Sequence, residues 1–365
     1  MNRLSTSCLS ALLCAWCVLG CGNTDAPARD YGPLLSKLSQ QVILPEHQDF
    51  VAQADALASS AQALVDDPST DSLESAQAGW RAVRKAYRTL DALHFGPGYT
   101  LHISERIDVA PAEPDGIEAL ATGSDIIGDS TISKAGGHEK GFLGLEYLLF
   151  ADASASAGTP APVLSDDAFA ERRRALALAM AHEIQHSARQ LDDAWEPGAG
   201  GYVTQLETAG SGSTEYNSQR AAVDDMVGGV AYALEMIVGV RLATPLGRKT
   251  GGTPNPSLDP TLRSDNAAAD MQATLAGIRA MYVGDGFSSV IRSKSTKLDE
   301  TVLDGLNSVE AAVAAIPTPF GDAVASDTQS VKNAFDAGAG LKTTWNTDVS
   351  SALGATLKPS DTDGD

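Results

Sequence analysis

One acid in an apolar segment is the first residue of this sequence that could do chemistry. Glu146 lies in the stretch from Gly136 to Phe150, and its neighbours from 142 onward are almost all phenylalanine, leucine or tyrosine. A carboxylate in such surroundings costs several kcal/mol unless it is paired, hydrogen-bonded or bound to a metal. We expect Glu146 either to bind a cation or a basic ligand in a pocket, or to be a structural acid paired with an arginine such as Arg84.

An H-E-x-x-H string on a predicted helix is the second candidate, and it consists of His182, Glu183 and His186. In zinc peptidases the two histidines of this motif bind zinc and the glutamate activates water. Helical periodicity turns both histidines away from the apolar stripe of their own helix, and no histidine follows His186 as a third ligand. The alternatives are a zinc site completed by a downstream acid, adventitious surface metal binding, and a solvated helix face, which the pattern favours.

A strongly amphipathic helix is predicted over residues 72–93. Its apolar stripe includes Trp80 and Tyr87, and Arg84 lies at the edge of that stripe. Trp80 and Tyr87 are expected to pack, whereas Arg84 is the possible partner of Glu146. The other basic residues of this helix are predicted to be solvated: Arg81, Lys85 and Arg88.

Composition and charge limit the fold and the partners. The 365 residues are 43% hydrophobic and only 5% aromatic, which suits closely packed helices better than a β-sandwich. The formal net charge of −21 makes nucleic acid and anionic membrane surfaces poor partners and leaves cations plausible. Solubility alone would also explain this charge.

Apolar periodicity predicts an all-α chain in two helical blocks. A Gly/Ser-rich zone at 198–213 separates a block at 31–197 from a block at 214–365, and Ser213 or Thr214 is expected to cap the first helix of the second block. Gly228 and Gly229 lie inside that helix and indicate a close helix crossing. In the first block, helices are predicted over 45–65, over 72–93, around Glu146, and from Asp166 or Asp167 to 195. In the second block they are predicted from Ser213 or Thr214 to about 242, and at 264–283, 297–315 and 322–354.

The first 21 residues are interpreted as a lipoprotein signal peptide. A charged start and a short apolar run end in Val18-Leu19-Gly20-Cys21, which resembles a bacterial lipobox. In this interpretation the chain is cut before Cys21, the new terminal cysteine is acylated, and residues 22–30 are a tether. All four cysteines lie in this segment, so the mature chain would have no disulfide and no cysteine metal site. We expect a periplasm-facing lipoprotein, anchored by lipid only and in the outer rather than the inner membrane; the alternative is a plain secreted protein.

Several ordered segments resemble signatures of the imelysin family. Together they cover the chain from about residue 35 to its end. They are Trp80–Arg84–Tyr87 with His94-Phe95-Gly96-Pro97, Arg106-Ile107-Asp108 with Pro111, Lys140 to Phe150, Arg241-Leu242 with Pro245-Leu246-Gly247, and Arg263-Ser264 with Asn266 and Asp270.

The resemblance implies an all-helical envelope protein of two bundle domains with a pocket in the cleft between them. Members of the family have been described as insulin-cleaving metallopeptidases, as iron-regulated proteins and as ligand-binding components of iron uptake. The resemblance therefore implies a divalent metal, iron or zinc, or a small ligand, together with envelope iron-transport components as partners. Its matching positions give the expected site residues: Arg84, Asp108, Leu143, Glu146, Arg263 and Ser264.

The sequence departs from the family at the central motif, G-x-H-x-x-E, where Leu143 stands in place of histidine. A histidine and a glutamate at i and i+3 share one helix face and can share a metal, which leucine cannot do. The nearest substitute is His138, predicted to lie in the preceding loop. Three functions stay open: a binding protein for a metal ion or small ligand, a metallopeptidase that uses Glu146 or the 182–186 histidines, and an interaction module with a decayed site.

Overall fold

The computed structural model describes residues 29–152, 156, 158–198, 201–249 and 251–357, and these residues contain helices and no strand. The predicted all-α class is therefore confirmed. From Tyr31 onward the chain forms one compact unit. The predicted division at 198–213 stays a prediction, and part of that zone is the short helix α10 (Tyr202–Glu207).

The remaining helices follow in chain order, with η marking short 3-10 or π-helical segments. In the first part of the chain they are α1 (Gly32–Leu38), η1 (Ser39–Ile43), α2 (Leu44–Asp66), α3 (Thr70–Thr89), η2 (Leu90–Leu93), α4 (Pro97–Thr100), α5 (Ser104–Ile107), α6 (Pro114–Thr122), α7 (Asp129–Lys134), η3 (Gly137–Glu139), α8 (Gly141–Leu149), η4 (Pro162–Leu164) and α9 (Ala170–Trp195). In the second part they are α11 (Gln219–Glu235), η5 (Met236–Leu242), η6 (Pro256–Leu258), α12 (Ala267–Tyr282), α13 (Phe287–Lys294), α14 (Thr296–Ala314), α15 (Phe320–Ser326), α16 (Thr328–Thr344), η7 (Trp345–Val349) and α17 (Ser350–Leu353).

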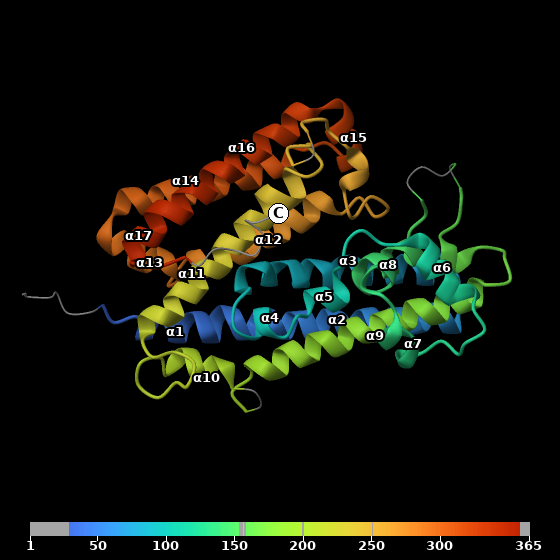
Figure 1. The fold of residues 1–365 in the computed structure, drawn as a ribbon, viewed down its shortest axis with the longest axis horizontal. Coiled ribbons are helices and arrows are strands. Elements are labelled where there is room, and N and C mark those ends of the chain that lie inside the picture. The colour runs from blue at the N-terminus through green and yellow to red at the C-terminus, as the bar shows by residue number, and fades with distance from the viewer. Residues whose placement is uncertain (1–28, 153–155, 157, 199–200, 250, 358–365) are drawn as a thin grey trace, which may run out of the picture. The chain divides into compact units, whose positions relative to one another are not determined.

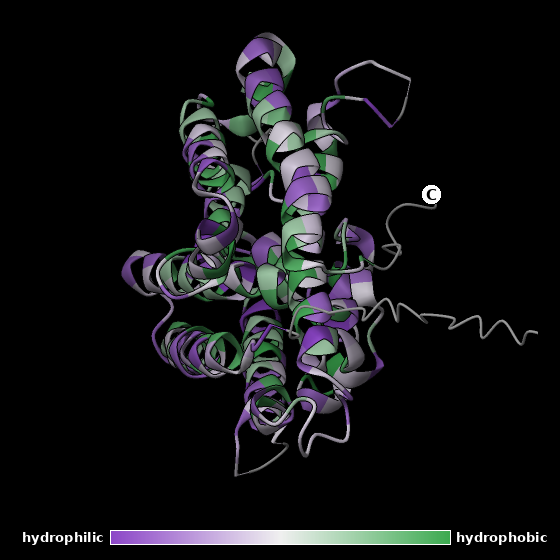
Figure 2. Cartoon of the chain, turned by 90° about the vertical axis from the view of Figure 1, so that its left-hand side faces the viewer, coloured by the Kyte–Doolittle hydropathy of each residue, from purple (hydrophilic) through white to green (hydrophobic). Residues whose placement is uncertain are grey.

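The first helix group packs α2 against α3 and α9, and these three helices run side by side (Figure 1). The short central helix α8 packs on α3 and α9. The stripe predicted on α3 is buried, with Trp80 fully inside. Figure 2 shows that the helices carry both hydrophobic and hydrophilic residues. Packing is favourable when the hydrophobic stripe of one helix faces its neighbour.

The second helix group packs α14 against α16 and against α12. It joins the first group where α12 lies on α3 and where α11 lies on η2. The hydrophobic core runs through both groups. This junction places residues from distant segments beside α3 and η2.

Three predicted helix boundaries were wrong, for local reasons. The helix expected to be capped by Asp166 or Asp167 begins at Ala170 with Phe169 as its N-cap, because Asp167 accepts from Phe169 N in the turn before it. The N-cap of α11 is Ser218, whose side chain accepts from Ala221 N at 3.2 Å, whereas Ser213 bonds within the preceding turn, to Gln205 and Tyr216. The helix predicted at 322–354 is interrupted at Asp327, whose ψ of 54° is not helical. Several hydroxyl residues precede α11, so composition alone could not select the cap.

The described part of the chain holds no helix that is both long and apolar enough to span a bilayer. Residues 1–21 with Cys21, nearly all of the tether at 22–30, and the acidic end after 357 lie outside the described residues.

Candidate functional site

Glu146 is buried in α8, with 3% of its surface exposed. Its Oε1 accepts two hydrogen bonds from Ser264, one from the backbone N at 2.8 Å and one from Oγ at 2.6 Å. Burial nevertheless raises the pKa of Glu146 to about 7, because the Ser264 hydrogen bonds and the more distant charge of Arg84 only partly offset desolvation. The carboxyl is therefore poised to change protonation near neutral pH.

Arg84 does not pair directly with Glu146, which corrects the structural interpretation offered for that acid. Its guanidinium binds Asp270 of α12, with Nη2 to Oδ2 at 2.7 Å, and Asp108, with Nη1 to Oδ1 at 3.1 Å. Arg84 is 1% exposed. Two carboxylates thus satisfy this buried cation, and Glu146 takes its donors from a loop instead.

Arg88 is buried, although the sequence predicted it to be solvated. It lies one turn after Arg84 and pairs with Asp108, and its Nη1 is 3.4 Å from Asp91 Oδ1. The junction with the second helix group covers this face of α3, which periodicity within α3 could not reveal. A charge that becomes buried on folding needs such partners.

Asp91 extends the cluster to the second helix group. Its Oδ2 accepts from Arg241 Nη2 at 2.7 Å and from Thr274 Oγ1 at 2.8 Å. Burial raises the pKa of Asp91, but the charges of Arg241 and Arg88 outweigh it and hold that pKa below its usual value. We call this ion-pair set the Arg–Asp cluster; it consists of Arg84, Arg88, Arg241, Asp91, Asp108 and Asp270.

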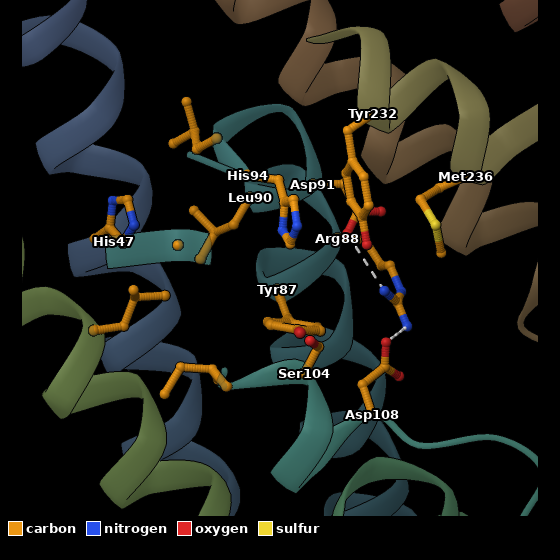
Figure 3. Close-up of a pocket in the computed structure, with 14 residues that line it drawn as sticks. His47, Tyr87, Arg88, Leu90, Asp91, His94, Ser104, Asp108, Tyr232 and Met236 are labelled. Carbon is orange, nitrogen blue, oxygen red and sulfur yellow. Dashed lines mark hydrogen bonds and ion pairs between the residues drawn. The ribbon is translucent and has the colours of Figure 1, made fainter. Parts of the chain in front are cut away.

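A cavity of about 160 Å³ lies beside the Arg–Asp cluster. Figure 3 shows Arg88, Asp91 and Asp108 on one side of it, with Tyr232 of α11 close by. The ring of His94 stacks on that of Tyr232, with centroids 3.7 Å apart. The cavity wall therefore combines charged groups with flat aromatic rings from both helix groups.

His47 of α2 also lines this cavity and is fully buried. Its Nδ1 donates to the carbonyl of Ile43 at 2.6 Å, and its Nε2 has no hydrogen-bond partner in the described part of the chain. Burial lowers the pKa of His47 to about 4. The ring is therefore neutral at pH 7.

The described side chains do not fit an iron or zinc centre. Nowhere in the described residues do three His, Cys, Asp or Glu side chains group so that they could hold a metal ion, whereas structural and catalytic zinc sites use at least three. Leu143 is buried in α8. His138 of η3 bonds the carbonyl of Pro111 at 2.7 Å. His182 lies half-exposed, 3.8 Å from Asp129, and His186 is exposed, as the helix face predicted.

The structure brings some of the predicted site residues together and separates others. Arg84 and Asp108 belong to the Arg–Asp cluster, and Glu146 and Ser264 bond each other. Arg263 lies apart from the cavity, over the Tyr147 ring, with its Nη2 3.1 Å from Asp152.

Sequence reasoning did not place several residues at this site. Arg241 and Asp270 stood in segments quoted for the resemblance, but their role needs the helix crossing. For Tyr232 and His47 no signal in the sequence pointed to a cavity. The residues missed are His47, Arg88, Asp91, Tyr232, Arg241 and Asp270.

Comparison with known proteins gives consistent results. The family model described as Imelysin matches residues 43–344. A candidate iron-regulated protein A precursor from Parabacteroides distasonis ATCC 8503 is similar in structure, with a TM-score of 0.78 and 19% identity over 90% of this chain and 97% of that one. An imelysin-like protein from Psychrobacter arcticum 273-4 has a TM-score of 0.72 and 16% identity over 90% and 96%. A search of curated proteins finds no match. Because the family model spans most of its length, the chain belongs to the imelysin family.

Proposed function

We propose that this protein is a cell-envelope lipoprotein that binds a small ligand in the cavity beside the Arg–Asp cluster and serves iron acquisition. The observation that carries the proposal is a cavity of about 160 Å³ walled in part by buried charged residues. Buried ion pairs are costly to maintain, and a concave site with a few convergent polar groups is the usual form of a ligand pocket.

Two observations support the envelope and iron parts of the proposal. Val18-Leu19-Gly20-Cys21 has the form of a lipobox, and one of the similar structures is described as a candidate iron-regulated protein. Peptide hydrolysis is a weaker alternative, because no group of metal donors in the described residues supports it.

The proposal is tested on untagged mature protein isolated from its native envelope. Native mass spectrometry is expected to reveal one bound small molecule, and its removal is expected to lower the melting temperature by mass action. Ser104 lines the cavity, so Ser104→Leu is expected to shrink it and abolish binding. Ser59→Leu, at an exposed position of α2, is the matched control and should retain the molecule.

Two results would contradict this function. One is a protein that carries no small molecule and shows no thermal shift. The other is stoichiometric iron or zinc that is lost in Glu146→Ala, which would support metal binding at α8 instead.

A further inference from the structure

Three hydroxyl groups without protein partners belong to residues that line this cavity. They are the hydroxyls of Tyr87, Tyr232 and Ser104. None of these three side chains makes a hydrogen bond to any described residue, whereas the buried hydroxyl of Tyr282 bonds Asp299 at 3.0 Å. Ser104 and Tyr232 are only partly buried, and all three residues line the cavity, so their hydroxyls are free to form hydrogen bonds with a ligand there.

Packing fixes the ring of Tyr87 while leaving its hydroxyl unpaired. The ring lies between Phe50 of α2 and Phe142 of α8, with centroid distances of 5.3 Å and 5.2 Å. Only 8% of Tyr87 is exposed. Burial, followed by the charge of Asp108, holds the pKa of Tyr87 well above its usual value, so the hydroxyl stays protonated and can both donate and accept.

Tyr232 of α11 presents a second phenolic hydroxyl to the cavity, from the other helix group. Its ring is held by the stack on His94, and burial with the charge of Asp91 raises its pKa to about 12. Figure 3 shows its hydroxyl on the same side as Arg88. The two rings therefore offer neutral hydrogen-bonding groups from two different helices.

The surrounding charges are balanced. Arg84, Arg88 and Arg241 are matched by Asp91, Asp108 and Asp270 through the ion pairs of the Arg–Asp cluster. The charged groups that line the cavity are Arg88, Asp91 and Asp108, and each of them is already in an ion pair. An added ionic ligand would therefore lose its hydration without finding an unpaired opposite charge, which is unfavourable in a buried site.

We infer that the ligand is a small organic molecule of no net charge, held by hydrogen bonds to Tyr87, Tyr232 and Ser104 and covered by flat aromatic rings. This inference rests on the proposed ligand-binding function and names its ligand class. The cavity is close in volume to an engineered cavity of about 150 Å³ that holds benzene, so the ligand has roughly six to ten non-hydrogen atoms.

Isothermal titration calorimetry on the mature protein tests this inference with probes of similar size. Erythritol and nicotinamide are uncharged, succinate is an anion, 1,4-diaminobutane is a cation, and Zn²⁺ is a bare metal ion. At least one uncharged probe is expected to bind at millimolar concentration or below, and the three charged probes are not. Each of Tyr87→Phe and Tyr232→Phe is expected to weaken that binding about fivefold, the effect of one lost hydrogen bond.

Tyr282→Phe provides a control with the opposite pattern. Its hydroxyl is bonded to Asp299, so this variant is expected to lower the melting temperature and leave probe binding unchanged. The two cavity variants are expected to keep the parent melting temperature, because their hydroxyls make no hydrogen bond that would be lost.

The outcomes separate the two proposals. If succinate, diaminobutane or Zn²⁺ binds the parent but not Ser104→Leu, the cavity binds ligands and only the inferred class is wrong. Binding of an uncharged probe that is unaffected by both phenylalanine variants also overturns the inference. If no probe of any class binds, the inference fails, and the proposed function fails with it when the native protein carries no small molecule.

Discussion

The pKa of Glu146 is set by burial rather than by a direct ion pair. Glu146 is 3% exposed and keeps a pKa of about 7 although Ser264 donates two hydrogen bonds to it. The raised pKa means that the folded state holds this proton more tightly than the unfolded chain, whose glutamate pKa is about 4.5. The stability that this proton contributes is therefore complete below pH 4.5 and is lost as the pH rises through 7.

Glu146→Gln is expected to remove this pH dependence, because the amide oxygen can still accept from Ser264 but cannot ionise. Between pH 5 and pH 8 the unfolding free energy of the parent should fall by roughly 2–3 kcal/mol more than that of the variant. Urea denaturation at both pH values measures the difference. An equal change in parent and variant would show that Glu146 has no raised pKa in the folded protein.

At the scale of elements, the helix crossings that build the cavity depend on glycine. Gly228 and Gly229 are neighbours in α11, but only Gly229 faces η2, where a Cβ would come 2.7 Å from the carbonyl oxygen of Ala92. A Cβ at Gly228 would meet nothing within 4 Å. The expected close crossing is confirmed, and the glycine that makes it is Gly229.

Gly229→Ala is expected to force α11 away from η2 and to lower the unfolding free energy by about 1–3 kcal/mol, as overpacking does. Gly228→Ala is the matched control, and it should be neutral or stabilising by about 0.5–1 kcal/mol because alanine suits a helix interior. Urea denaturation distinguishes the two variants. Equal effects from both substitutions would show that the crossing tolerates a side chain.

At the scale of the whole molecule, the net charge of the protein and its proposed attachment to the membrane are separate properties. The formal net charge of −21 is spread over a chain whose buried Arg–Asp cluster is balanced. Such a surface has no electrostatic attraction to anionic lipid, so the proposed membrane attachment depends on acylation of Cys21.

Cys21→Ser is expected to move the protein from the membrane fraction to the soluble fraction, because several acyl chains hold a protein firmly and none would remain. Cys17→Ser also removes a leader cysteine but keeps Cys21, so it should still fractionate with the membrane. Immunoblots of the separated fractions measure both. A Cys21→Ser protein that stays with the membrane would rule out this anchor.

The sequence by itself determined the helical class, most helix positions and the burial of Glu146. Each of these depends on local spacing: the stripe that includes Trp80 and Tyr87 repeats at helical intervals, and α2 and α3 begin and end within three residues of the predicted bounds except where η2 extends α3. The outward direction of His186 followed from the same periodicity.

Only the tertiary structure decided which groups meet. Ser264 reaches Glu146 from 118 residues away, and Asp270 reaches Arg84 from 186 residues away. Periodicity within one helix fixes which face a residue lies on, but it cannot say whether a second helix will cover that face. That is why Arg88, predicted to be solvated, is buried where α12 and η2 meet. It is also why spacing could indicate a close crossing at Gly229 but could not identify η2 as its partner or predict the cavity beside it.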